Sequence, residues 1–156
     1  MTSRFFEEFY RERNTTTNVM LKLGMGLSPI AAVEGETAHL KFTAYPSNTS
    51  VTVGTRFSLA LDVTPGPDMH VYAPGAEEKG YRVIGFNLDK PELARIEPVS
   101  YPESEIYYFE PLDEHVPVYQ EKFTILQEVV MNGDAETEEI MSTLDALTLT
   151  GTLDYQ

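Results

Sequence analysis

The sequence predicts a mainly β protein, an antiparallel β-sandwich preceded by a short helical appendage at the N-terminus, and three observations support this. From residue 37 onwards apolar side chains alternate with polar ones, most clearly over residues 57–63, with the period of two that is typical of half-buried strands. Short runs of this kind are separated by turns rich in proline and glycine. Little helical pattern lies between the runs, which argues against a parallel α/β sheet.

The length of 156 residues is enough for one hydrophobic core, so we expect one main domain plus an appendage. Residues 3–13 place aromatic side chains such as Phe5 and Phe9 at helical spacing. This spacing predicts a short amphipathic helix, although the same run is also compatible with a strand that enters a turn.

Residues 14–24 predict a second short helix, with Asn14 or a threonine as its N-cap and Gly24 as its stop. Small and turn-forming residues follow, which is typical of a linker. We therefore place the domain boundary near residue 34, with residues 1–34 as appendage and linker and residues 35–156 as the sandwich.

Seven or eight short strands are expected beyond the boundary, which is the number typical of a sandwich. The expected strands cover residues 40–44, 57–63, 70–72, 81–87, 94–99, 116–119, 122–131 and 146–155. The segment 134–144 is predicted to be a solvated loop between the last two long strands. One or two helical turns are the alternative, because acidic residues near its start would lie at the favourable end of a helix dipole.

The charge balance limits the partners that the chain can bind. Eleven basic against 25 acidic residues give a net charge of −14, which disfavours nucleic acid and anionic membrane surfaces and fits a basic or neutral protein. No apolar stretch is long enough for a membrane span, and the first residues lack the apolar centre of a signal peptide. We expect no cofactor. The composition itself leaves the compartment open.

The chain contains no cysteine. Disulfides, thiolate metal sites and cysteine nucleophiles are therefore excluded for these residues. The consecutive Asp113, Glu114 and His115 could supply an acid, a base or metal ligands, but neighbouring side chains point in different directions, so we expect a solvated turn, no metal site and no hydrolase. His70 is predicted to be a packed or rim histidine at the start of a strand.

Aromatic residues gather in the second half of the chain and give the best internal indication of a binding site. Tyr72 and Tyr119 lie within apolar alternation and are expected in the core or at its edge. Residues 107–109 are three consecutive aromatics that must face both sides, so at least one is expected to be exposed. We expect the binding site in the loop that we assign to residues 101–119.

Ordered sequence pieces carry a family resemblance over residues 37–156. They are VTVGTRFSLALDVTPGPDMHVYAPG, then EPVSYPESEIYYFEPLDEHVPVYQEKFTILQEVV, and finally LDALTLTGTLDYQ. Together they resemble the DsbD-like family, the N-terminal periplasmic domain of protein-disulfide reductases. The resemblance implies an immunoglobulin-like sandwich in a periplasmic or extracytoplasmic setting, which relays reducing equivalents by thiol-disulfide exchange to a thioredoxin-like protein or domain.

The resemblance also implies roles for particular residues. In the family a cysteine pair follows the final Tyr-Gln, whereas this sequence ends at Tyr155-Gln156, so the expectation is a truncated or degenerate copy that cannot exchange disulfides by itself. The cap loop that shields the cysteines would correspond to Tyr108 and Phe109. The remaining implied site residues are His70 and Tyr72 on the preceding strand, with Glu110, Asp113 and Glu114 as acidic neighbours that would tune a thiol pKa.

The N-terminal residues 1–24 resemble the tail of a thioredoxin-like redoxin domain. Two functions remain open at this point. The first is a DsbD-like reductant-relay domain without its reactive cysteines. The alternative is a cysteine-free immunoglobulin-like module that binds a protein or a glycan through residues 101–119.

Overall fold

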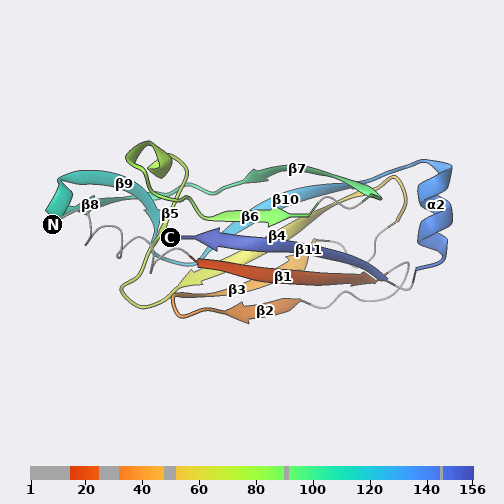
Figure 1. Ribbon diagram of the computed structural model, residues 1–156, viewed down its shortest axis with the longest axis horizontal. Coiled ribbons are helices and arrows are strands. Elements are labelled where there is room, and N and C mark those ends of the chain that lie inside the picture. The colour runs from red at the N-terminus through yellow and green to blue at the C-terminus, as the bar shows by residue number, and fades with distance from the viewer. Residues whose placement is uncertain (1–14, 25–31, 48–51, 90–91, 145) are drawn as a thin grey trace.

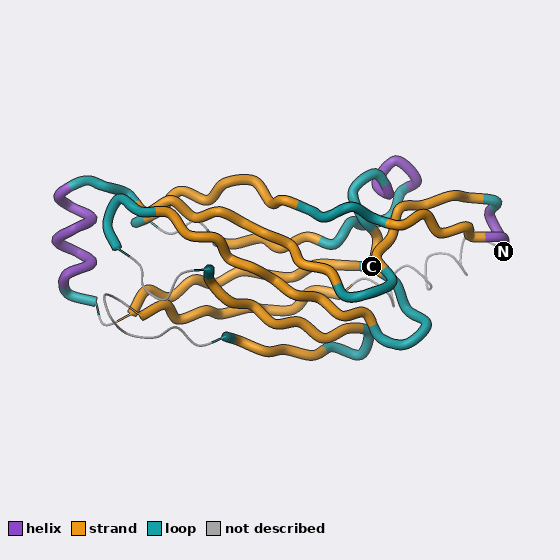
Figure 2. The backbone as a smooth tube through the Cα atoms, turned by 180° about the vertical axis from the view of Figure 1, so that it is seen from behind, coloured by secondary structure: helices purple, strands orange, loops and turns teal. Residues whose placement is uncertain are grey.

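The computed structural model describes residues 15–24, 32–47, 52–89, 92–144 and 146–156. The helix expected over residues 3–13 lies outside the described residues. The described chain is mainly β, as predicted, and forms an elongated antiparallel sandwich with two main layers (Figure 1). A single α-helix lies at one end among the described residues, and a β-hairpin projects at the other (Figure 2).

The described strands form three sheets. The first has the order β1-β11-β6, with β1 at Thr15–Gly24, β11 at Ala146–Tyr155 and β6 at Gly85–Leu88. The second has the order β2-β3-β4-β10-β7, from Val33–Glu36, Leu40–Pro46, Arg56–Pro65, Phe123–Met131 and Ala94–Ser100. The third, which we call the hairpin sheet, has the order β5-β9-β8, from Val71–Tyr72, Glu114–Tyr119 and Glu105–Phe109. The remaining elements are the 3₁₀ turns η1 (Ala76–Lys79) and η2 (Glu110–Leu112) and the helix α2 (Ala135–Ser142).

The core lies between the first two sheets. On β4 and β10 every second side chain is buried, as the period of two predicts. These residues pack against Phe86 of β6 and Leu153 and Tyr155 of β11 in one continuous cluster. The neighbouring strands β4 and β10 of the second sheet pair antiparallel from Phe123↔Val63 to Val130↔Arg56.

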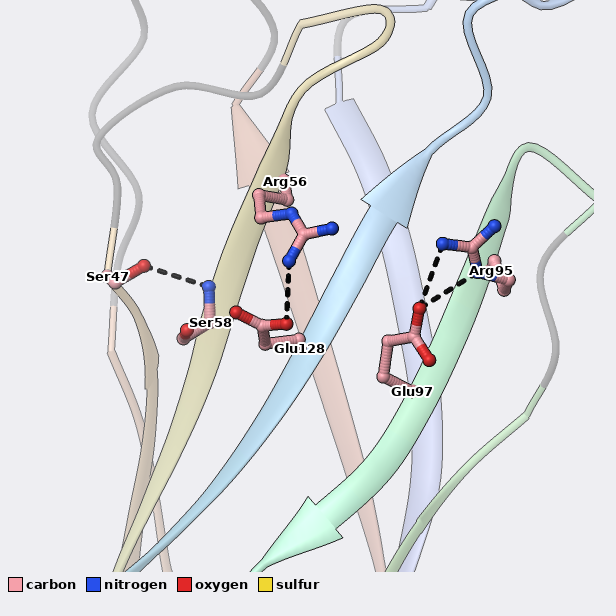
Figure 3. Close-up of polar contacts among 6 residues, drawn as sticks. All are labelled: Ser47, Arg56, Ser58, Arg95, Glu97 and Glu128. Atoms are coloured by element: carbon pink, nitrogen blue, oxygen red, sulfur yellow. Dashed lines mark hydrogen bonds and ion pairs between the residues drawn. The ribbon is translucent and has the colours of Figure 1, made fainter.

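The outer face of the second sheet carries polar pairs (Figure 3). The Arg56 guanidinium on β4 lies 3.0 Å from the Glu128 carboxylate on β10. On β7, Arg95 and Glu97 form an ion pair at 2.9 Å. The solvent-exposed face of this sheet thus carries charges of both signs.

The helix predicted over residues 14–24 is wrong, because residues 15–24 form strand β1. This strand pairs with β11 along its whole length, from Thr15↔Tyr155 to Gly24↔Ala146. β-Branched side chains at the start of β1 favour a strand, and the long pairing with β11 outweighs the helix-capping pattern. The expected boundary near residue 34 falls within strand β2 (Val33–Glu36), which pairs with β3 of the second sheet.

The loop predicted over residues 134–144 is also wrong, and the helical alternative is correct. The Asp134 carboxylate caps α2 by accepting a hydrogen bond from the Thr137 N–H at 2.7 Å. This bond is the main reason that the pKa of Asp134 lies below its usual value. Met141 is buried in the core and anchors the last turn.

The strands were otherwise placed correctly, with differences at their ends. The strand expected over residues 81–87 is confirmed only in part, since β6 covers Gly85–Leu88. Residues 105–109, which we had assigned to a loop, form strand β8 and pair with β9 from Glu105↔Val118 to Phe109↔Glu114. The short strand β2, in the expected linker, pairs with β3.

Candidate functional site

The hairpin sheet positions the residues that the sequence singled out. Strand β5 leads into η1, and the glycines on either side of η1, Gly75 and Gly80, have the positive φ values of 105° and 87° that favour glycine. This turn brings the Tyr81 ring under that of Tyr72, where the two stack with centroids 4.3 Å apart. Tyr81 is buried in a small second core with Ala76 and the β9 valines Val116 and Val118.

A groove of about 620 Å³ runs between β5 and the hairpin, and we call it the aromatic groove. It is lined by Asp68, Met69, His70, Tyr72, Tyr81, Glu105, Tyr107, Phe109, Gln120 and Glu121. Aromatic faces supply its walls, while carboxylates and an amide lie around them. Such a surface can hold an apolar side chain and discriminate by charge at the same time.

His70 lies among the tyrosines of this groove. Its ring meets the Tyr107 ring at a centroid distance of 4.6 Å and the Tyr72 ring edge-on at 5.2 Å. His70 is half-buried, so the predicted rim position is confirmed. The Tyr81 hydroxyl donates a hydrogen bond to the Glu114 carboxylate at 2.9 Å, which links the floor of the groove to strand β9.

The opposite face of the hairpin holds a separate polar cluster. The Tyr108 hydroxyl donates to the Asp113 carboxylate at 2.6 Å, and this bond is the main reason that the pKa of Tyr108 lies above its usual value. The His115 ring lies 4.8 Å from the Tyr108 ring. Asp113 and His115 thus both lie beside Tyr108, whereas Glu114 points to the other face and contacts Tyr81. The three side chains do not converge on one point.

The end of β11 lies at the base of the hairpin sheet (Figure 1). A second pocket of about 530 Å³ is lined there by His39, Pro67, Asp68, Met69, His70, Tyr155 and Gln156. The Tyr155 hydroxyl bonds to Thr37 and lies 3.0 Å from His39 Nδ1. Gln156 is buried and accepts a hydrogen bond from the Arg82 N–H at 2.7 Å. The segment Asp68–His70 lines both pockets, which therefore lie next to each other.

The structure brings together only some of the site residues predicted from sequence. His70, Tyr72 and Phe109 line the aromatic groove. Tyr108 is exposed on the other face, which confirms that one of the three aromatics is exposed. Glu110 is exposed on η2 at the tip of the hairpin and does not line the groove.

Tyr107 and Tyr81 both line the groove, although neither is among the residues to which the family resemblance assigns a role. The period of two could have identified Tyr107, because residues 107 and 109 of a strand share one face. The assignment of residues 101–119 to a loop leaves no strand to which this rule could apply. No local sequence pattern identifies Tyr81 as a groove residue, because its position depends on how β5 and η1 fold.

Within the described ranges, no three histidine or acidic side chains come close enough together to hold a metal ion. In the same part of the chain, no helix has both the length and the apolar character needed to cross a bilayer.

Comparisons with known proteins return no relative: no protein-family model matches the chain, and neither the curated proteins nor the solved structures give a significant match. The function of the chain therefore has to follow from its own residues and geometry.

Proposed function

We propose that this chain is a DsbD-like protein-binding domain, and that it binds a thioredoxin-like partner in the aromatic groove. The proposal assigns recognition to the chain and no chemical step. Thiol-disulfide exchange needs a thiolate, and these residues include no cysteine.

One observation carries the proposal. The groove is lined by aromatic residues from separate parts of the chain, namely His70 and Tyr72 near β5 and Tyr107 and Phe109 on β8. Large, rigid aromatic side chains of this kind supply most of the binding energy at many protein interfaces.

The position of the groove agrees with the sequence resemblance. The resemblance expects aromatic cap residues next to the Tyr-Gln that closes the last strand. In this fold Tyr155 and Gln156 line a pocket that adjoins the groove and shares Asp68–His70 with it. A partner that contacts the groove would thus lie beside the end of β11.

The test uses two neighbouring aromatic residues of the same strand. Phe109 lines the groove, whereas Tyr108 faces away from it. We expect Phe109→Ala to weaken the binding of a reduced thioredoxin by about tenfold or more, the usual effect of removing an interface anchor. Tyr108→Ala is the matched control and should leave the affinity within about threefold of the wild type. Isothermal titration calorimetry measures both.

Thermal unfolding of the two variants verifies that each is folded. The proposal is wrong if the wild type gives no binding signal with thioredoxin, or if Phe109→Ala binds as tightly as Tyr108→Ala.

A further inference from the structure

Strand β8 forms an open edge of the hairpin sheet. The strand order is β5-β9-β8, so β9 covers only one side of β8, and no other described strand pairs with it. A strand at an edge presents main-chain N–H and C=O groups that a further strand can bind.

Pro117 shows which main-chain groups of β8 point outwards. Ile106 lies opposite Pro117, which has no N–H, and the Pro117 carbonyl accepts its hydrogen bond from Ala73 on the β5 side. Ile106 and Pro117 therefore form a non-hydrogen-bonded pair. Because such pairs alternate with hydrogen-bonded ones along an antiparallel ladder, Tyr108 and His115 form the next non-hydrogen-bonded pair. The N–H and C=O groups of Ile106 and Tyr108 thus face away from β9.

The side chains of the same two residues are also exposed. Ile106 is 64% exposed, the highest fraction among the large hydrophobic residues of the described chain, and Tyr108 is 47% exposed. The edge strand β7 carries the Arg95–Glu97 ion pair (Figure 3). By contrast, β8 has no charge at its two outward-facing residues, so charge does not protect this edge.

The surroundings of β8 are acidic. Residues 101–121 contain no lysine or arginine, and their carboxylates are those of Glu103, Glu105, Glu110, Asp113, Glu114 and Glu121. Glu105 and Glu121 line the aromatic groove, on the face opposite Ile106 and Tyr108. A second copy of this chain would bring the same negative charges against this edge, whereas a basic segment would neutralise them.

We propose that β8 binds an extended segment of a partner protein as an added strand, and that this segment alternates apolar and basic residues. Its main chain bonds to the outward groups of Ile106 and Tyr108. Its apolar side chains pack on the face of Ile106 and Tyr108, and its lysine or arginine side chains lie on the face of Glu105 and Glu121. This surface shares Glu105 and Glu121 with the aromatic groove of the proposed function. It differs from the groove because its hydrogen bonds come from the main chain of the β8 edge.

The probe is a short fluorescent peptide of alternating Val and Lys, titrated with the full chain and followed by anisotropy. We expect it to bind about tenfold or more tightly than the same peptide with Glu in place of Lys. A second analogue keeps the lysines, and therefore the charge, but is N-methylated at alternate residues. It lacks the main-chain N–H donors along one edge of the extended peptide. We expect this analogue to lose about tenfold in affinity.

Ile106→Pro is the matching change in the protein. It removes the outward N–H of residue 106 and none of the hydrogen bonds between β8 and β9. We expect this variant to lose about fivefold or more in affinity for the Val-Lys peptide, and Ile106→Val, which keeps the N–H, to stay within about twofold.

Hydrogen exchange of the wild-type chain gives a readout that needs no variant. The amides of Ile106 and Tyr108 should gain protection when the Val-Lys peptide binds. The proposal is overturned if protection appears elsewhere, if the N-methylated or the Glu peptide binds as well as the Val-Lys peptide, or if Ile106→Pro binds as well as Ile106→Val. A chain that fails to bind thioredoxin can still bind this peptide, so the two proposals fail separately.

Discussion

Tyr119 links the hairpin sheet to the main core. It lies at the end of β9, where its ring stacks on Phe123 of β10 with centroids 4.0 Å apart. Its hydroxyl donates a hydrogen bond to the Pro102 carbonyl at 2.7 Å, just before β8 begins. Because the residue is only 4% exposed, this hydroxyl has little access to water as an alternative partner.

Tyr119→Phe should therefore lower the free energy of unfolding by about 1 kcal/mol, the usual net value of one hydrogen bond. Urea denaturation measures the change. Tyr108→Phe is the control, because its hydroxyl is exposed and water can replace the bond to Asp113. Equal stability of wild type and Tyr119→Phe would contradict the importance of this bond.

The same comparison has an expected pH dependence. Burial, together with the nearby Tyr101, raises the pKa of Tyr119 to about 12. A tyrosine in an unfolded chain titrates near pH ~10. Since the folded pKa is the higher one, the contribution of Tyr119 is complete below about pH 10 and is lost as the pH rises towards about 12. The advantage of the wild type over Tyr119→Phe should shrink over that range.

At the scale of secondary structure, the close pairing of β11 with β6 depends on Gly151. A Cβ at this position would lie 2.5 Å from the Asn87 carbonyl oxygen and 3.0 Å from the Leu88 Cα. Both atoms belong to the β6 main chain and cannot move without displacing the strand.

Gly151→Ala should therefore destabilise the protein by roughly 1–3 kcal/mol, the usual cost of overpacking. Gly85→Ala on β6 is the matched control, since its Cβ would meet the flexible Asn87 side chain at 3.4 Å and the Val83 carbonyl oxygen at an ordinary contact distance of 4.0 Å. Thermal unfolding compares the two, and a Gly151→Ala variant as stable as Gly85→Ala would show that β6 can move away at little cost.

The elements also show what the sequence could predict. The alternation on β4 and β10 predicted their position and buried faces, because each strand has one face in the core. Strand β1 could not be predicted in this way, since its stability comes from pairing with β11 at the far end of the sequence. Helix α2 was missed although Asp134 is a suitable N-cap.

The candidate site was predicted in part for the same reason. The aromatic run of residues 107–109 identified the hairpin, and Phe109 does line the groove. The aromatic side chains that face the groove can be identified only if residues 105–109 are recognised as a strand. The turn-forming residues around this segment favour a loop instead. Tyr81 stacks on Tyr72 because the turn after β5 folds the chain back, and no local sequence pattern indicates this contact.

The whole molecule carries a large negative charge, −14 at neutral pH. The ion pairs Arg56–Glu128, Arg95–Glu97 and Lys122–Asp62 of the described residues lie at or near the surface. Excess charge of one sign destabilises a compact state through self-repulsion, and salt screens this repulsion.

The melting temperature should therefore rise when sodium chloride is raised from about 0.01 M to about 0.15 M, where the Debye length falls to about 8 Å. The sequence has an isoelectric point of about 4.5. Near that pH the net charge vanishes, so the salt effect should become small. A melting temperature that falls with salt at pH ~7 would show that attractive ion pairs outweigh the repulsion.

Pro117 has a second consequence, for the course of the chain on the other side of β9. Pro117 has no main-chain N–H to donate to the Ala73 carbonyl. This carbonyl instead accepts a hydrogen bond from the Ala76 N–H at 3.0 Å. That bond closes a turn, so β5 ends at Tyr72 and the chain reverses into η1. The proline on β9 thus removes a hydrogen bond that would continue the pairing of β5 beyond Tyr72, at the point from which the chain returns to place Tyr81 beneath Tyr72.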